Sequence, residues 1–364
     1  MTSLLQNEGY RVTVVTPKIY SDSPYFENQN GIKVYRFPFL AGDKLLIEHE
    51  TIPYLRMVIY YMTGFFFSLY SILRNRCDLI HVHWAIPTGL IGVVAGWLLR
   101  KPMVVTIHGS DLRIAVSGPS VLKRIFVHVC QAARHVHVVS EPMKNVVEGL
   151  GISREKISTW PMGVDDVFLQ AGENRKANWN GRPITVLSNR NLLPIYDVSC
   201  LIRAIPLVLQ QAPEVRFLIA GDGPEKESLE KEAERLQVHS AVQFLGRVSH
   251  DQMPELLAEA NIFVSTSLSD GTSVSLLEAL TSGAFPVVTD ITANREWIRH
   301  GENGLLVPVR DEKIMAERII EAIQNADLRE EARKRNLEIV KQRGYWEGNI
   351  PKMIEIYKHC LAAG

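Results

Sequence analysis

Two acidic side chains flank a short polar stretch whose composition suits the binding of an anion. Asp270 follows a predicted strand, Gly271 comes next, and Glu278 lies eight positions after Asp270 on a predicted helix. Glycine lets backbone amides approach a ligand closely, and the N-terminus of a helix favours negative charge. A carboxylate one or two turns into that helix can accept hydrogen bonds from ribose hydroxyls. The pattern predicts a nucleotide site; its plainer alternative is a capping Asp followed by a surface Glu.

Three histidines form the second group of candidates. His108 lies at the C-terminal end of a predicted strand, where it would face a ligand cleft or else satisfy a loop carbonyl. His81 and His83 alternate along another strand and therefore share one face. Such a pair can bind a metal, but no third ligand follows at a supporting spacing, so we predict no metal. Asp111 is predicted either to bind acceptor hydroxyls or to cap the next segment.

The first half of the chain alternates strands with helices, a pattern typical of βαβ units on a parallel sheet. The chain begins with residues that resemble the end of a helix rather than a first strand, and they lack the features of a secretory signal. The predicted strands are 11–17, 31–37, 78–83, 102–108 and 135–140, and the predicted helices are 89–99, 119–133 and 141–150.

A second alternating series follows a polar stretch rich in Gly and Asn. The sequence therefore predicts an α/β protein of two Rossmann-like, doubly wound domains, 1–170 and 184–343, with a linker at 171–183. The two domains are expected to face a central cleft, which is the default ligand site. The predicted strands of the second series are 184–188, 215–220, 242–245, 261–265, 285–289 and 305–307, with a final helix 313–343 broken near Asp327.

Composition excludes several other classes of protein. The 364 residues include 40 Lys+Arg and 40 Asp+Glu, and 46% are hydrophobic, as in ordinary globular enzymes. The balanced charge argues against broad binding of nucleic acid. The four cysteines lie far apart and lack CxxC spacing, so we expect reduced thiols in a cytoplasmic protein.

The stretch from Ile52 to Leu73 is apolar over the length of a membrane span and carries one charge, Arg56. Pro53, Gly64 and four tyrosines argue against a span, and a span here would split one sheet. Three interpretations stay open: a core or cleft-side helix, an interfacial surface that contacts lipid, and a true span.

These motifs together resemble family 4 of the retaining glycosyltransferases, which have the two-domain GT-B architecture. The family signature is Glu-x7-Glu, usually followed by Ala-x-x-x-Gly-x-Pro-Val-Val. This chain has Asp270-x7-Glu278 and then Ala279, Gly283, Pro286, Val287 and Val288, with one extra residue between Gly and Pro. Further landmarks in family order are His81-Val-His83-Trp, Thr106-Ile-His108-Gly-Ser-Asp111, Pro161-Met-Gly163-Val-Asp165, Ala220-Gly-Asp-Gly-Pro224, Phe244-Leu-Gly246-Arg-Val248 and Gly301-Glu-Asn-Gly304.

The resemblance implies roles for individual residues. Glu278 would hold the donor ribose, and Asp270 would lie near hydroxyls of the donor sugar. His108 would touch that sugar near the reacting carbon, and Arg190 would neutralise the diphosphate, so His108, Asp270 and Arg190 are the implied catalytic residues. The other implied contacts are the backbone amides around Gly271, Thr272, Ser273, Val274 and Ser275, the tight turn of Gly221 and Gly223, Arg247 and Val248 near the base, and Asp111 on the acceptor side.

Two departures from the family pattern concern this site. The family has a Lys five residues after the Arg, where this chain has Ile195, and either Tyr196 or Arg203 would have to replace that diphosphate partner. The family also begins with a strand and a Gly-Gly loop, but this chain has no Gly-Gly pair, so we expect the first domain to lack its N-terminal strand. The segment 344–364 resembles the C-terminal helix that crosses back to the first domain.

The function implied by the resemblance is retaining, metal-independent transfer of a hexosyl or related sugar. The donor would be a nucleotide-diphosphate sugar, the acceptor a glycan, glycolipid or polysaccharide precursor, and no cofactor is expected besides the donor. The stretch 52–73 adds a predicted peripheral contact at the cytoplasmic face of a membrane. Two alternatives are a catalytically weak nucleotide-sugar-binding partner subunit and, on the same architecture, a sugar-nucleotide epimerase.

Overall fold

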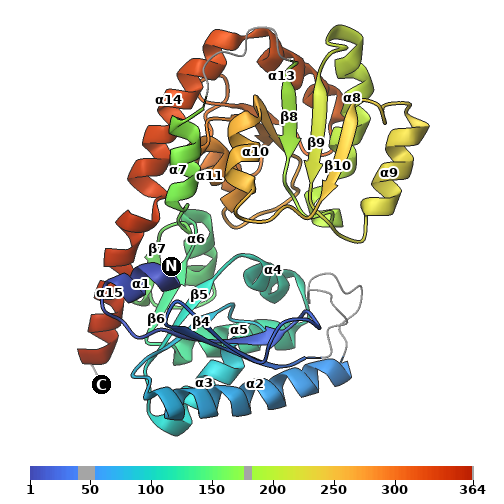
Figure 1. The fold of residues 1–364 in the computed structure, drawn as a ribbon. Helices are drawn as coiled ribbons and strands as arrows, with labels where there is room; N and C mark the ends of the chain where they lie inside the picture. Colours follow the sequence, from blue (N-terminus) through green and yellow to red (C-terminus); the bar gives the residue numbers. More distant parts are fainter. Residues whose placement is uncertain (40–53, 176–182, 363–364) are drawn as a thin grey trace. The chain divides into compact units, whose positions relative to one another are not determined.

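The computed structural model describes residues 1–39, 54–175 and 183–362, drawn in colour in Figure 1. The chain divides into two compact units. Unit 1 consists of Met1–Pro161 and Glu347–Gly364, and unit 2 consists of Met162–Trp346. The predicted linker falls largely on 176–182, outside the described residues, as do Ile52 and Pro53 of the aromatic stretch.

Unit 1 contains two sheets instead of the single parallel sheet that the alternation predicted. The first has the order β1-β3-β2 and the second the order β4-β5-β6-β7. The strands are β1 (Thr13–Lys18), β2 (Phe26–Gln29), β3 (Ile32–Pro38), β4 (Ile80–His83), β5 (Met103–Ile107), β6 (His135–Val138) and β7 (Ile157–Thr159). The helices are α1 (Thr2–Asn7), α2 (Tyr54–Asn75), α3 (Gly89–Leu99), α4 (Ser110–Ser117), α5 (Ser120–Ala132), α6 (Glu141–Gly149) and α15 (Trp346–Ala362).

The sequence interpretation missed a hairpin in unit 1. β2 pairs antiparallel with β3, whereas the pairing of β1 with β3 is parallel, as expected. The turn between β2 and β3 is Asn30-Gly31, and both residues have positive φ, 51° and 90°. Asn-Gly is the dipeptide that tight hairpins favour for this reason. β2 itself is short and polar, which is why its composition gave no strand signal.

The edge strands β1 and β4 of unit 1 are less buried than the inner strand β5. All six residues of β1 are half-buried, and so are three of the four in β4, whereas β5 is buried throughout. Among the described residues, no strand pairs with the edge of β1 away from β3 or with the edge of β4 away from β5. The other edges of these sheets are β2 and β7, and the absence of an N-terminal strand stays a prediction.

Unit 2 is a single parallel sheet of six strands, in the order β10-β9-β8-β11-β12-β13. The strands are β8 (Thr185–Ser188), β9 (Arg216–Ala220), β10 (Val242–Gly246), β11 (Ile262–Ser265), β12 (Phe285–Thr289) and β13 (Leu305–Val307), close to the predicted ranges. The helices are α7 (Asp166–Glu173), α8 (Val198–Gln211), α9 (Lys226–Arg235), α10 (Met253–Glu259), α11 (Val274–Thr281), α12 (Thr292–Arg295), α13 (Glu312–Gln324) and α14 (Ala326–Arg343).

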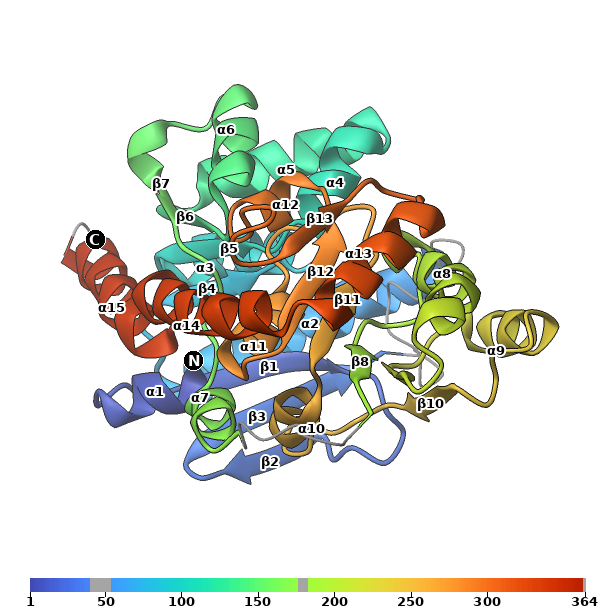
Figure 2. The ribbon, with the colours of Figure 1, turned by 90° about the horizontal axis from the view of Figure 1, so that it is seen from above.

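Alternate residues of the central strands feed two separate cores, as the two-residue period of a strand requires. In β11, Ile262 and Val264 pack in one cluster with α8 and α13, while Phe263 packs in the other with α11. Helices therefore cover both faces of the sheet, as can be followed in Figures 1 and 2. The α/β class with parallel sheets is confirmed.

The compact units divide between Pro161 and Met162, before the predicted boundary at 170. The reason is α7, whose Phe168 is fully buried in the core of unit 2 beside α11. Gly163 also belongs to this unit, because a side chain at that position would collide with the ring of Trp346. At the other end of unit 2, the break near Asp327 is real: the Asn325 side chain accepts a hydrogen bond from the Leu328 amide (2.9 Å) and starts α14.

Candidate active site

The predicted donor residues gather at one edge of the unit 2 sheet. Arg190 follows β8, Gly221 and Gly223 follow β9, and Asp270 lies between β11 and α11. The strands are parallel, so their carboxyl ends meet at the same edge, which is where open α/β sheets bind ligands.

An ion pair is the centre of this edge. The Arg190 Nη2 atom donates a hydrogen bond to Asp270 Oδ2 (2.7 Å), and its Nη1 donates to Ser273 Oγ (3.0 Å). The Arg190 and Asp270 side chains are only 8% and 17% exposed, so the pair is shielded from water. The guanidinium also lies over the Tyr196 ring, 4.1 Å from its centroid. The resemblance gave Arg190 and Asp270 separate targets, diphosphate and sugar, but here they bind each other.

Ser273 joins this ion pair to α11. It is the N-cap of the helix, and its Oγ accepts a hydrogen bond from the Leu276 amide (3.2 Å) while it accepts from Arg190. The amides of Val274 and Ser275, in the first turn, have no acceptor within the helix by construction. The Gly271 amide instead donates to Asp270 Oδ1 (2.8 Å). A helix N-terminus with donors beside a guanidinium is suited to an anion such as a diphosphate.

Glu278 lies one turn deeper along α11 than these amides. Burial, with a smaller contribution from the charge of Asp165, raises its pKa from 4.5 to about 7, while Arg190 acts in the opposite direction. Among the described residues, none donates a hydrogen bond to its carboxylate. A partly buried carboxylate without a donor is costly to the free protein and is satisfied when ligand hydroxyls bind.

Glycines hold the loops behind the ion pair close together. A Cβ on Gly221 would collide with the carbonyl oxygen of Arg190, and one on Gly223 with the carbonyl of Leu192. The Leu192 amide donates to the Asp222 carbonyl (3.0 Å), and Gly221 donates to that of Gly246 (2.8 Å). The predicted tight turn is therefore present, and it links the ends of β8, β9 and β10.

The residues after β10 and near the missing Lys are arranged differently. Arg247 is exposed, while Val248 packs against the core beside α10. Ile195 occupies the family's Lys position, and its carbonyl accepts a hydrogen bond from the Leu268 amide (2.9 Å). Arg203 lies within ion-pair distance of Asp197, Glu232 and Glu312 (4.0, 3.6 and 3.9 Å), so these carboxylates and not the site hold its charge. Tyr196 is the substitute that lies beside Arg190, through its ring rather than through a hydrogen bond.

In unit 1 the predicted His108 belongs to a cluster of four histidines, His81, His83, His108 and His137, called here the histidine cluster. The rings of neighbours stack at 4.6 Å (His81 on His83) and 5.1 Å (His83 on His108). His83 Nδ1 and His108 Nε2 share a hydrogen bond of 2.9 Å, which fixes the orientation of the His108 ring. Burial lowers the pKa of His83 to about 4 and those of His108 and His137 to about 3, so the cluster is neutral at pH 7.

His81 connects this cluster to the C-terminal helix of the same unit. Its Nδ1 bonds to the Tyr357 hydroxyl (2.6 Å), and its Nε2 bonds to Thr106 (2.7 Å), which in turn contacts His137 (3.2 Å). Both ring nitrogens of His81 are therefore satisfied by protein. Among the described residues, no group of three or more His, Cys, Asp or Glu side chains is arranged to hold a metal ion.

Asp111, in the first turn of α4, accepts backbone hydrogen bonds from two loops of unit 1, but α4 has Gly109 as its N-cap and no side-chain cap. The side chain is fully buried, and its two oxygens accept hydrogen bonds from the amides of Ala85 (2.8 Å), His108 (3.2 Å) and Gly109 (3.1 Å). Burial raises its pKa to about 6, although these amides act in the opposite direction. The carboxylate ties the loops after β4 and β5 together, and its role toward acceptor hydroxyls stays a prediction.

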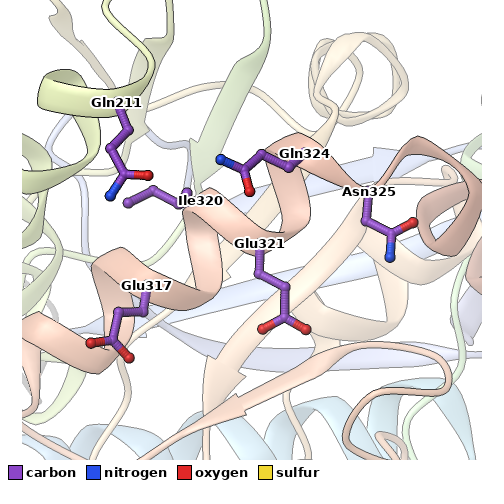
Figure 3. Close-up of a pocket in the computed structure, with 6 residues that line it drawn as sticks. All are labelled: Gln211, Glu317, Ile320, Glu321, Gln324 and Asn325. Carbon is purple, nitrogen blue, oxygen red and sulfur yellow. The ribbon is translucent and has the colours of Figure 1, made fainter.

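A depression beside α8 and α13 is a different feature, shown in Figure 3. It has a volume of about 460 Å³ and is lined by Gln211, Glu317, Ile320, Glu321, Gln324 and Asn325. These residues lie toward the C-terminal ends of their helices, which is the edge of a parallel sheet opposite the strand carboxyl ends. None of the predicted site residues lines it, and two carboxylates would repel a diphosphate.

Sequence reasoning missed several partners in these sites. Asp165, which raises the Glu278 pKa, and Tyr357, which binds His81, are far from their partners in sequence, and no local spacing could have found them. The capping function of Ser273 was detectable, because Ser directly before an apolar helix is a typical N-cap.

Comparisons with known proteins agree across both halves of the chain. The family model described as glycosyl transferases group 1 matches residues 171–338, and the model for glycosyltransferase family 4 matches residues 1–168. N-acetyl-alpha-D-glucosaminyl L-malate synthase of Bacillus anthracis is 25% identical over 294 residues, 79% of this chain and 76% of that protein.

Two solved structures are similar to the whole fold. Sucrose-phosphate synthase from Thermosynechococcus elongatus has a TM-score of 0.80 at 20% identity, covering 100% of this chain and 92% of its own. Anabaena HepE in complex with UDP and glucose has a TM-score of 0.72 at 20% identity, covering 90% and 86%. At these identities the two structures support the fold alone.

Proposed function

The chain belongs to the group 1, family 4 glycosyltransferases, and from this premise we propose that unit 2 binds a nucleoside-diphosphate sugar whose sugar the enzyme transfers to a glycan or lipid-linked precursor. The observation that carries the proposal is the grouping of Arg190, the first turn of α11 and the half-buried Glu278 at one sheet edge. These groups are of the types that bind a diphosphate and a ribose.

Transfer breaks the bond between the anomeric carbon of the sugar and the β-phosphate oxygen, which keeps the electron pair. The negative charge that develops there would be stabilised by Arg190 and by the amides of Val274 and Ser275. The acceptor oxygen forms the new bond on the same face, its hydroxyl proton passes to the departing β-phosphate oxygen, and the configuration is retained. We propose that neither a metal nor a cofactor takes part, and that the transfer reaction occurs at the cytoplasmic face of a membrane.

The donor base is proposed from the similar structure that contains UDP. Thermal unfolding of the full chain should be followed with UDP, GDP, ADP and their sugar conjugates, with EDTA present. A ligand that binds the native state raises the apparent melting temperature. We expect UDP or a UDP-sugar to do so and the Glu278→Ala variant to lose the effect. No shift with any nucleotide diphosphate would refute the donor site.

One observation favours the alternative of a nucleotide-sugar-binding subunit with weak activity. Arg190 is already paired with Asp270, and Ile195 replaces the second cation of the family. Less positive charge is then free for the leaving diphosphate. Donor binding without hydrolysis or transfer, measured with radiolabelled UDP-sugars, would support this alternative. Conversion of the donor sugar without an acceptor would instead indicate an epimerase.

A further inference from the structure

The outer face of α2 in unit 1 carries a row of large apolar side chains exposed to solvent. They recur at intervals of three or four residues, so they form one stripe along the 22-residue helix, about 33 Å long. Leu55 is 75% exposed and Leu73 is 63% exposed, so the stripe reaches both ends. Its members are Leu55, Val58, Met62, Phe66, Tyr70 and Leu73.

The opposite face of α2 is part of the unit 1 core, which excludes a true span. Tyr60 is buried in a cluster with Phe37, Phe39 and Ile91, and a Cβ on Gly64 would collide with Ile91. By length and composition alone, Leu55–Asn75 could cross a membrane. A helix that contributes one face to a folded core is not free to do so. Of the three interpretations of this stretch, the core helix therefore applies to one face, and the interfacial surface that contacts lipid stays a prediction for the other.

Helix α3 extends the apolar surface beside α2. The two helices pack against each other and cover the same side of the unit 1 strands, α2 over β1 and β3 and α3 over β4 and β5 (Figure 1). The outward residues of α3 are Val94, Trp97 and Leu98, and Trp97 is 80% exposed. An exposed tryptophan beside a row of aliphatic and aromatic side chains is unusual on a surface that only meets water.

The charges around this surface have one dominant sign. Residues 54–101 contain five basic side chains, Arg56, Arg74, Arg76, Arg100 and Lys101, and one acidic side chain, Asp78. Asp78 lies 3.8 Å from Lys101, and neither α2 nor α3 contains an acidic residue. The chain as a whole is balanced at 40 and 40, so the excess is local. Basic groups flanking apolar and aromatic ones match anionic headgroups above acyl chains.

From the stripe, from Trp97 and from this local charge, we infer that the outer face of α2 and α3 docks on the surface of an anionic lipid bilayer. The helix lies in the plane of the membrane with the stripe inserted, and the arginines contact headgroups. Trp97 sits at the level of the headgroups, as tryptophans at membrane interfaces do. The inference concerns unit 1 alone and does not depend on the donor chemistry proposed for unit 2.

The test is flotation of the full chain with vesicles of phosphatidylcholine alone or mixed with phosphatidylglycerol. We expect binding to the anionic vesicles, weakened by salt. Phe66→Ser and Leu73→Ser should each weaken vesicle binding about tenfold, because each variant lacks a large apolar side chain that would move from water into the bilayer. Arg74→Gln should weaken it about fivefold on anionic vesicles and leave the neutral ones unchanged. Val309→Ser, which removes an exposed apolar side chain from unit 2, is the matched control.

Trp97 supplies a second readout, which does not rely on the Ser and Gln variants. The chain has six tryptophans, so the signal of Trp97 is the difference between the wild type and Trp97→Phe. Bilayers with brominated acyl chains should quench that difference, and Trp97→Phe should still bind. No flotation with either vesicle, or flotation without quenching, overturns the inference. Reversible dimerisation that Phe66→Ser abolishes, without vesicle binding, would assign the surface to a second copy of the chain instead.

Discussion

Replacing Glu278 by Gln should make the free protein more stable and its donor binding weaker. The carboxyl of Glu278 has a pKa of about 7 instead of 4.5, chiefly because it is buried. A difference of this size corresponds to about 3 kcal/mol between the ionised and protonated forms. The folded protein holds this proton more tightly than the unfolded chain. The native state therefore loses stability as the pH rises from about 4.5 through about 7.

The glutamine variant keeps the shape of the side chain and removes the charge. At pH 8 it should be more stable than the wild type by up to about 3 kcal/mol, and at pH 4.5 the two should be equal. Hydrogen exchange of β11 and α11 peptides in increasing denaturant reports the stability of unit 2 locally. Glu255→Gln, which removes an exposed carboxylate from the same unit, is the matched control.

Donor binding should change in the opposite direction. A carboxylate that accepts hydrogen bonds from ribose hydroxyls contributes about 1.5–3 kcal/mol, so nucleotide affinity should fall about tenfold or more in Glu278→Gln. Isothermal titration with the nucleotide found to stabilise the wild type measures this at pH 8. A stability gain that is equal at both pH values would refute the assignment of the cost to burial. An unchanged affinity beside a real stability gain would refute the ribose role alone.

Three further predictions concern the ion pair, the glycine turn and the histidine cluster. Asp270→Asn leaves the Arg190 guanidinium without its carboxylate, so the free energy of unfolding of the free protein should fall by about 3 kcal/mol. UDP should raise the melting temperature of this variant more than it raises that of the wild type. An equal UDP shift would contradict the pairing. Gly221→Ala should lower the free energy of unfolding by about 2 kcal/mol and raise the donor KM, because the new Cβ would collide with the Arg190 carbonyl. Gly149→Ala adds a Cβ with nothing within 4 Å, so it should leave the thermal unfolding unchanged. The histidine cluster should make unit 1 unstable in acid, because the pKa of His83 is about 4 instead of 6.5. The stability present above pH 6.5 is lost as the pH falls toward about 4, by up to about 3 kcal/mol for this group. Urea unfolding of unit 1 at pH 7 and pH 5 measures this loss.

The features that the sequence predicted well are local ones. The strands of unit 2 and the α11 motif depend on runs of apolar residues and on Gly and Ser at fixed offsets, which act within a few positions of the chain. The hairpin of β2 and β3 was missed although Asn30-Gly31 announced it, because the β2 residues are polar and the alternation around them is short.

The contacts that could not be predicted join residues far apart in sequence. Arg190 and Asp270 are separated by 80 positions, and both were expected at the site with separate ligands. Sequence pattern places such residues at one sheet edge but does not say whether they bind each other or a ligand. The same limit applies to Asp111: its position in the sequence does not reveal that its carboxylate is buried and accepts hydrogen bonds from three amides.

The ion pair also shows how a site with one cation can serve a diphosphate. A flexible arginine would lose side-chain entropy on binding, but Arg190 is already held by Ser273, by Asp270 and by the Tyr196 ring. The Arg190 side chain is therefore fixed before any donor binds, although its positive charge is shared with the Asp270 carboxylate. The family's Lys, replaced here by Ile195, would add positive charge but would not fix the position of the Arg190 side chain. A preorganised guanidinium beside the amides of α11 therefore supports the proposal that this edge binds a nucleoside diphosphate, and the rate of transfer is the property that Ile195 in place of the Lys would reduce.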